Sequence, residues 1–178
     1  MARKLLTEEI HRLSTDEFRQ ADKLPLVVVL DNVRSLHNVG SVFRTADAYR
    51  VQHIVLCGIT ATPPHAEIHK SALEAEFCVD WSYAESTVDA CQQLLQQGYT
   101  LLSIELAEGS ISLPNLQLDA SKKYAIVLGN EVSGVNQKVI DLSNGCVELP
   151  QFGTKHSLNV SVTAGIVIWE FWRALSQQ

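Results

Sequence analysis

The stretch Leu26-Val27-Val28-Val29-Leu30 decides the fold class of this 178-residue chain. It is an unbroken apolar run rich in β-branched residues, which is typical of a strand that is buried on both faces. Strands of this kind belong to mostly parallel sheets, because the crossover connections of such sheets place helices on both faces. The run therefore predicts an α/β fold with a covered central strand.

The rest of the chain continues this pattern, with apolar strand-like runs alternating with amphipathic helical ones. Beyond the first run we expect strands at 53–57, 77–81, 99–104, 124–128 and 146–149. We expect helices at 39–49, 87–97, 135–142 and 160–175, and a loop at 60–69, where Pro63-Pro64 interrupts the pattern. The alternation predicts one domain over residues 25–178, with a mostly parallel sheet and helices on both faces.

The N-terminal segment 1–24 differs from this domain. It carries charges of both signs around the apolar residues Leu5, Leu6, Ile10, Leu13 and Phe18. This pattern predicts a helical extension that Ser14 or Thr15 caps. The segment is polar and lacks a signal-peptide core, and no apolar run in the chain approaches the roughly 20 residues of a membrane helix. We therefore expect a cytoplasmic protein without membrane association.

The four cysteines are scattered and form no CxxC pair: Cys57, Cys78, Cys91 and Cys146. Zinc sites and redox pairs need closely spaced cysteines, so buried free thiols are the favoured interpretation. We therefore expect no metal centre.

Polar segments follow several strands, at the sheet edge where open parallel sheets bind ligands. In the first, 31–48, apolar residues are spaced to face the core, and Arg44 projects from the opposite side of the predicted helix. We expect Asn38 to cap that helix. An ordinary capped helix with a surface arginine would give the same pattern.

The second segment, Gly129-Asn130-Glu131-Val132-Ser133-Gly134, has glycines at both ends that let the backbone turn sharply. It is not a P-loop, because Val135-Asn136 stands where lysine and Ser/Thr would follow. The third segment, 150–159, ends in Ser157 and Asn159, two good helix-capping residues. Ordinary strand-to-helix connections would account for either segment alone.

Together the three segments resemble the three motifs of the SpoU/TrmH branch of the SPOUT methyltransferases. The counterpart of motif one in this chain is Asn38-Val39-Gly40 with Arg44-Thr45-Ala46-Asp47-Ala48, and the counterpart of motif two is 128–134. Motif three resembles Leu149-Pro150 with Ser157-Leu158-Asn159-Val160-Ser161. The resemblance extends over about residues 24–175. The chain departs from it at Val132, where motif two usually has glycine, and at Gln151, where motif three usually has methionine.

The resemblance implies a deep C-terminal trefoil knot that holds S-adenosylmethionine (AdoMet) in a bent shape. Six residues would line the cofactor pocket: Glu105, Gly129, Asn130, Leu149, Ser157 and Leu158. The reaction would be attack of an RNA ribose 2′-hydroxyl on the cofactor's methyl group, without a metal. The family assigns proton abstraction to the position of Arg44.

A guanidinium is almost never deprotonated, so we expect Arg44 to hold a phosphate and stabilise the developing alkoxide instead. Asn38 would orient the ribose or Arg44, and Glu131 and Asn159 would hold the motif loops together. The family also implies a homodimer through the motif-one helix and the C-terminal helix. Burial of the last helix beneath residues 1–24 is an equal alternative.

The compact chain and its short extension favour tRNA over rRNA as the substrate. The formal net charge of −6 is unusual for an RNA-binding protein, which needs cations to neutralise phosphates. Two other classes of protein therefore stay open. One is a knotted dimer that binds RNA or AdoMet without turnover, and the other is a flavodoxin-like enzyme for a small metabolite.

Overall fold

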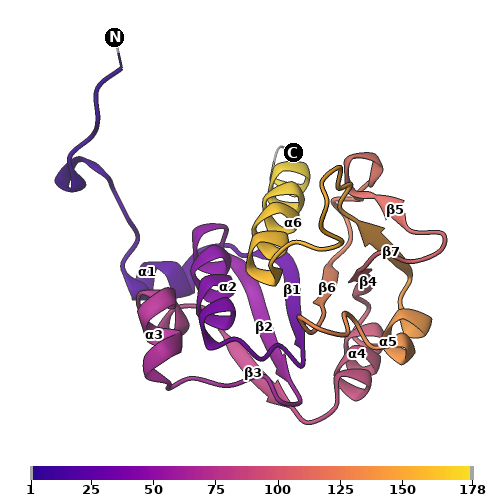
Figure 1. Ribbon diagram of the computed structural model, residues 1–178. Helices are drawn as coiled ribbons and strands as arrows, with labels where there is room; N and C mark the ends of the chain where they lie inside the picture. The colour runs from indigo at the N-terminus through magenta and orange to yellow at the C-terminus, as the bar shows by residue number, and fades with distance from the viewer. Residues whose placement is uncertain (1, 177–178) are drawn as a thin grey trace.

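The computed structural model describes residues 2–176 and is built around one seven-stranded sheet (Figure 1). The strands lie in the order β3-β2-β1-β6-β4-β7-β5, and every neighbouring pair is parallel. Their bounds are β1 Leu24–Asp31, β2 Val51–Cys57, β3 Trp81–Ala84, β4 Thr100–Ile104, β5 Ile111–Ser112, β6 Tyr124–Leu128 and β7 Gly145–Glu148. The predicted α/β class and parallel sheet are confirmed.

Helices cover both faces of the sheet (Figure 1). They are α1 Thr15–Gln20, α2 Leu36–Ala48, α3 Ala66–Ala72, α4 Thr87–Gln96, α5 Gln137–Leu142 and α6 Val160–Leu175, with 3₁₀ turns η1 Thr7–Glu9, η2 Ala75–Phe77 and η3 Leu113–Asn115. Val28 of β1 packs into the core beneath α2 and α6, whereas Val27 and Val29 pack into the core beneath α4. Successive side chains of a strand point to opposite faces, so the continuous apolar run reflects burial on both.

Three local predictions were wrong. Helix α2 begins at Leu36 and Ser35 caps it, so Asn38 lies inside the helix and is not its cap. The segment 60–69 is not all loop, because α3 starts at Ala66 and buries Ile68 against the core. The third strand occupies 81–84 rather than 77–81, since η2 takes up the earlier residues.

The N-terminal segment is helical only in part. Ser14 caps α1 through a capping box with Glu17, and Phe18 is the buried residue of that helix. Residues 2–13 form an arm that projects away from the domain (Figure 1), and Leu5 and Leu6 of the arm are exposed. The arm does not lie over α6, so the alternative in which residues 1–24 bury the last helix is wrong.

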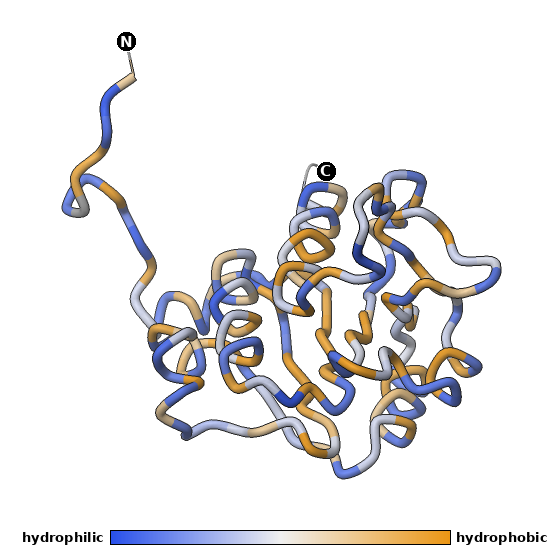
Figure 2. The backbone as a smooth tube through the Cα atoms, viewed as in Figure 1, coloured by the Kyte–Doolittle hydropathy of each residue, from blue (hydrophilic) through white to orange (hydrophobic). Residues whose placement is uncertain are grey.

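Hydropathy follows the layers of the fold: the hydrophobic segments gather in the central strands (Figure 2). Within residues 2–176, no helix combines the length and the apolar character that crossing a membrane requires. The chain leaves β4, forms β5 at the sheet edge and returns through β6 to the middle of the sheet. The deep knot that the resemblance implies at this crossover stays a prediction.

Candidate functional site

The main cavity lies where β4, β6 and β7 end, at the carboxyl edge of the sheet. Its volume is about 530 Å³, which is within the range of small-molecule sites. The strand ends give it an apolar floor of Ile104, Leu128 and Val147. Its walls are the loop after β4, the loop 129–134 after β6 and the segment 149–159 before α6. Polar segments that are far apart in the sequence therefore converge on one cavity with an apolar floor.

Two glycines make the 129–134 loop possible. A Cβ atom on Gly129 would lie 2.1 Å from the carbonyl carbon of Gly134, so only glycine allows the two ends of the loop to close. Gly134 has a φ of +67° and a Cβ there would lie 2.1 Å from Oε2 of Glu105. The backbone groups of residues 130 and 134 hydrogen bond to each other across the loop. The sharp turn that the two glycines predicted is confirmed.

Side chains from neighbouring strands hold this loop in place. The Glu105 carboxylate accepts hydrogen bonds from the backbone N–H of Val135 at 2.9 Å and of Leu106 at 3.0 Å. The Asn130 amide donates to the carbonyl oxygen of Asn32 at 2.6 Å. Its Oδ1 accepts from the backbone N–H of Val132 at 2.8 Å. Glu105 and Asn130 line the cavity, but these side-chain atoms support its wall.

Glu131 joins the second motif to the first. Its carboxylate accepts hydrogen bonds from the backbone N–H groups of Arg34 and Ser35 at 3.0 and 3.1 Å. It also accepts one from the side-chain amide of Asn38 at 3.0 Å. Burial raises the pKa of Glu131, but the bonds from Arg34, Asn38 and Ser35 outweigh this and bring it below its ordinary value. Glu131 is therefore an anion that ties the start of α2 to the cavity wall.

The segment before α6 forms the opposite wall. Asn159 caps α6, with its Oδ1 accepting from the backbone N–H of Ser161 at 2.9 Å. This bond stays within the segment, and no side-chain bond of Asn159 reaches another motif in the described part of the chain. Asn159 therefore shapes the helix start and, unlike Glu131, does not link two motifs.

Arg44 lies outside the cavity. It projects from the exposed side of α2, and among residues 2–176 it forms no hydrogen bond or ion pair. The cavity lining includes neither Arg44 nor Asn38. Asn38 is connected to the site only through Glu131. One chain therefore does not bring the predicted catalytic arginine to the predicted cofactor pocket.

The structure brings together eight of the predicted site residues around the cavity: Glu105, Gly129, Asn130, Glu131, Leu149, Ser157, Leu158 and Asn159. Sequence reasoning missed other lining residues, among them Leu106, Val132, Gln151, His156 and Thr163. All of these lie within two positions of a predicted residue or one helical turn into α6. The signal that would have found them is adjacency to the strand ends.

Cysteines contribute no nucleophile to this site. Burial raises the pKa of Cys57 and of Cys91 to about 12, so both thiols stay protonated near neutral pH. In the part of the chain that the structure describes, no cluster of three or more His, Cys, Asp or Glu side chains could hold a metal ion. The chemistry of the site therefore rests on its carboxylates, amides and backbone groups.

Comparison with known proteins places this geometry in a family. Residues 25–169 match the model of the SpoU rRNA methylase family. A tRNA (guanosine(18)-2′-O)-methyltransferase of Aquifex aeolicus is 29% identical over 88% of this chain and 72% of its own length. A Staphylococcus aureus protein with the provisional name of TrmH family tRNA/rRNA methyltransferase is 30% identical over 87% of this chain and 61% of its own length.

A solved structure agrees with these relatives. The AdoMet-bound rRNA methyltransferase of Sinorhizobium meliloti superposes with a TM-score of 0.79 at 28% identity, over 89% of this chain and 60% of that one. The chain thus spans about 60% of the length of two of the three proteins. With its parallel sheet, its strand-end cavity and its three motifs in order, the chain belongs to the SpoU rRNA methylase family.

Proposed function

We propose that this protein transfers a methyl group from AdoMet to a ribose 2′-hydroxyl of RNA, with tRNA as the favoured substrate. The observation that carries the proposal is the cavity, which is lined by all six residues expected to hold the cofactor: Glu105, Gly129, Asn130, Leu149, Ser157 and Leu158. Family membership supports the same chemistry. It leaves no support for an unrelated flavodoxin-like enzyme.

The residues present fit AdoMet. An adenine ring needs an apolar slot with backbone hydrogen-bonding groups, and Leu149 and Leu158 lie in the lining beside the exposed backbone of 129–134. A sulfonium group carries a positive charge, and two acidic residues, Glu105 and Glu131, line the cavity. AdoMet, when bound, supplies an electrophilic methyl group, so these residues need only bind and orient it.

Catalysis by the chain's own residues would consist of positioning and charge stabilisation. Arg44 is a permanent cation, so it would hold an RNA phosphate and stabilise the alkoxide that forms as the 2′-hydroxyl loses its proton. A phosphate oxygen or a water would take that proton. Asn38, held by Glu131 at 3.0 Å, would orient the ribose or Arg44 from the start of α2.

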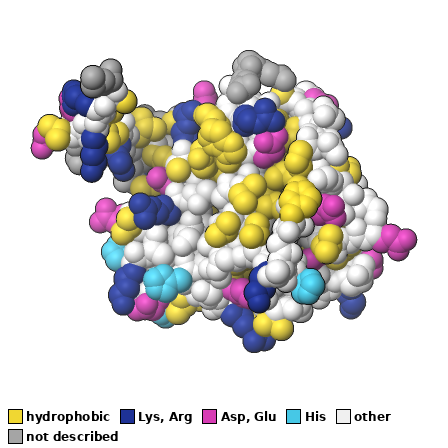
Figure 3. All heavy atoms as spheres, turned by 45° about the horizontal axis from the view of Figure 1, so that its top comes forward, with side chains coloured by type: hydrophobic (Ala, Val, Ile, Leu, Met, Phe, Trp, Pro, Cys, Tyr) yellow, Lys and Arg dark blue, Asp and Glu magenta, His cyan; other side chains and the backbone are white. Residues whose placement is uncertain are grey.

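The position of Arg44 supports a homodimer. Helix α2 packs against α6, and α6 exposes Val162, Ile166 and Trp169 on its outer side. Trp169 and Trp172 lie 5.0 Å apart between ring centres, and both lie beside Tyr49 at the end of α2. Hydrophobic side chains gather on this face of the molecule (Figure 3). Pairing through α2 and α6 would cover this apolar surface and would bring the partner subunit's Arg44 to the cavity.

The relatives differ in the class of RNA for which they are named. The Aquifex relative is named for tRNA and the Sinorhizobium protein for rRNA. The acidic balance of the whole chain does not exclude RNA, because basic side chains can concentrate locally, as Lys155 and His156 do beside the cavity. A cytoplasmic location remains a prediction.

The test is an assay with labelled AdoMet and unmodified tRNA or rRNA, followed by mass spectrometry of the nucleosides. We expect a 2′-O-methylated nucleoside in tRNA. Arg44→Ala should abolish turnover and leave the calorimetric Kd for AdoMet unchanged, since the proposed contacts of Arg44 are with the RNA and not with the cofactor. AdoMet binding without methylation of either RNA would point instead to the non-catalytic binding protein.

The homodimer has its own measurement. Sedimentation at micromolar concentration should give a dimer, and Trp169→Glu should give a monomer that keeps the fold and loses turnover. A wild-type monomer that still methylates RNA would contradict the shared site.

A further inference from the structure

Phe152 is the most exposed large hydrophobic side chain of the described residues, with 96% of its surface open to water. It lies in the segment between β7 and α6, next to Gly153. A Cβ atom added to Gly153 would meet no atom within 4 Å beyond its two chain neighbours, so the backbone here is open to solvent. An aromatic ring gains free energy from burial or stacking, so a ring held in open solvent suits contact with another molecule.

The ring lies at the edge of the cofactor cavity and not inside it. Gln151 and His156 line the cavity on either side in the sequence, whereas Phe152 is absent from the lining. Leu106 and Val132, which are 72% and 82% exposed, stand on the other walls of the same cavity. Phe152 is therefore placed to meet a molecule that approaches the cavity from outside, as the methyl acceptor must.

The charge around the ring complements RNA. Lys155 and His156 follow Phe152 closely, and no Asp or Glu occurs between Glu148 and Glu170. This is an uninterrupted neutral-to-basic segment in a chain with a net charge of −6. Proteins that bind unpaired RNA combine cations that meet phosphates with aromatic rings on which bases stack.

We propose that an unpaired RNA base next to the methylated nucleotide stacks on Phe152, while Lys155 contacts the adjoining phosphate. The segment 151–156, defined here as the rim segment, then selects flexible, single-stranded RNA and holds it over the cavity. This inference rests on the proposed function, because it names how the acceptor is held. Phe152 is a binding residue in this role and touches no reacting atom.

The experiment measures RNA affinity by fluorescence anisotropy, with labelled, unmodified full-length tRNA and AdoMet present, alongside KM and kcat. Phe152→Ala should weaken RNA binding and raise KM about tenfold, since stacking contributes about 1–3 kcal/mol per base. Its kcat and the Kd for AdoMet should stay within about twofold of the wild-type values. Phe152→Trp should restore affinity because indole stacks as well as phenyl.

A matched control is Phe77→Ala, which removes another exposed phenyl ring, 55% open to water, from the region of α3. It should leave RNA affinity unchanged. Lys155→Ala should lower the slope of log affinity against log salt by about 0.7–1, as expected for one lost phosphate contact.

Two results would overturn the inference. One is an unchanged RNA affinity in Phe152→Ala, and the other is a loss confined to AdoMet affinity, which would make the ring a cover for the cofactor. Anisotropy does not require methyl transfer. A wild-type protein that binds RNA through Phe152 but never methylates it would therefore contradict the proposed function and leave the inference standing.

Discussion

Two walls of the same cavity are built in opposite ways. The loop 129–134 is fixed by hydrogen bonds that join it to two other segments, the end of β4 through Glu105 and the segment 31–48 through Asn130 and Glu131. The rim segment 151–156 is exposed along its whole length, and none of its side chains hydrogen bonds within the described residues. The fixed wall can orient a small cofactor without losing conformational entropy on binding, because it is already ordered. The open wall can adapt its conformation to a larger and more variable acceptor.

The glycines give the sharpest contrast between the walls. Gly134→Ala should lose at least about 1–2 kcal/mol of stability, because alanine disfavours the left-handed backbone, and it also displaces Glu105. We expect AdoMet affinity to fall about tenfold or more, as a loss of about 1.4 kcal/mol implies. Calorimetric titration and urea unfolding measure the two effects.

The matched change on the open wall is Gly153→Ala, where a Cβ meets no atom within 4 Å. It should alter neither stability nor AdoMet affinity. Equal effects of the two substitutions would remove the distinction between a fixed and an open wall.

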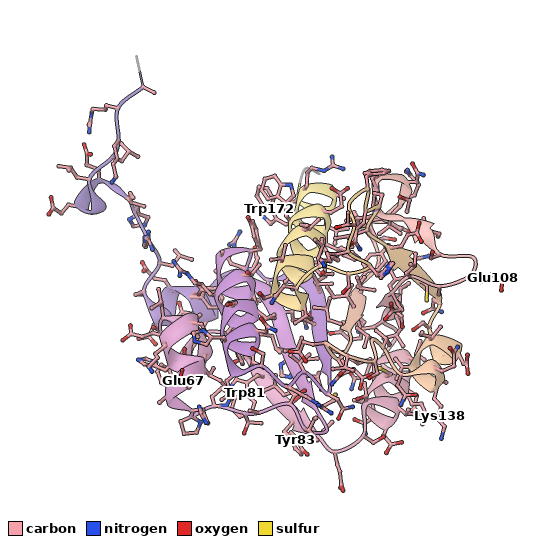
Figure 4. The ribbon with its side chains drawn as sticks, viewed as in Figure 1. Glu67, Trp81, Tyr83, Glu108, Lys138 and Trp172 are labelled. Carbon is pink, nitrogen blue, oxygen red and sulfur yellow. The ribbon has the colours of Figure 1, made fainter. Side chains whose placement is uncertain are left out.

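Glu131→Ala separates the start of α2 from the fixed wall. It leaves two backbone N–H groups and the Asn38 amide without their acceptor, so we expect a loss of about 1–3 kcal/mol in the free energy of unfolding. Glu108→Ala serves as the control, because its exposed carboxylate projects from the loop after β4 (Figure 4). If both variants unfold at the same urea concentration, the hydrogen bonds that link the first two motifs contribute nothing to the free energy of unfolding.

Asn159→Ala tests the helix cap that follows the rim segment at the start of α6. Losing the cap of α6 should cost about 1 kcal/mol, and Asn159→Asp should retain most of the stability because aspartate caps equally well. Thermal unfolding of the two variants checks this. A loss as large as that of Glu131→Ala would mean that this wall, too, depends on a connection between segments.

The smallest effect concerns pH. The pKa of Glu131 is lowered in the folded protein, so its stabilising contribution is complete above about pH 4.5 and is lost as pH falls through the lower, folded value. The difference in unfolding free energy between wild type and Glu131→Gln should therefore shrink below about pH 4.5. It should be small, since solvent screens this partly exposed carboxylate. A difference that stays constant down to pH 3 would contradict the charged state of Glu131.

Much of the fold, and the position of the cavity at the strand ends, could be predicted from the sequence because both depend on local patterns. The six residues proposed to hold the cofactor came from the family resemblance instead. Apolar runs such as Leu26–Leu30 mark buried strands, and the residues that follow such strands mark the cavity. Contacts between distant segments could not be predicted this way. Both Ser35 and Asn38 are residues of the kind that caps helices. In the structure Ser35 is the cap of α2, and the side chain of Asn38 instead donates a hydrogen bond to Glu131, 93 positions away.

Arg44 illustrates a further limit. Helical spacing correctly placed it on the side of α2 that faces away from the core, but that spacing cannot say what it meets there. The pattern was also misleading at 60–69, where Pro63-Pro64 suggested a loop although α3 begins two residues later. Proline constrains the residues beside it and does not prevent a helix from starting soon afterwards.

The aromatic cluster at the end of α6 has a practical consequence. The chain contains three tryptophans, and two of them, Trp169 and Trp172, stand together with Tyr49 on the outer side of the molecule (Figure 4 labels Trp172). Trp169 is 45% exposed, so its fluorescence responds to whether water or protein surrounds it. The unlabelled protein therefore carries an optical reporter at the surface proposed for the dimer, so that dilution alone can test whether the protein self-associates.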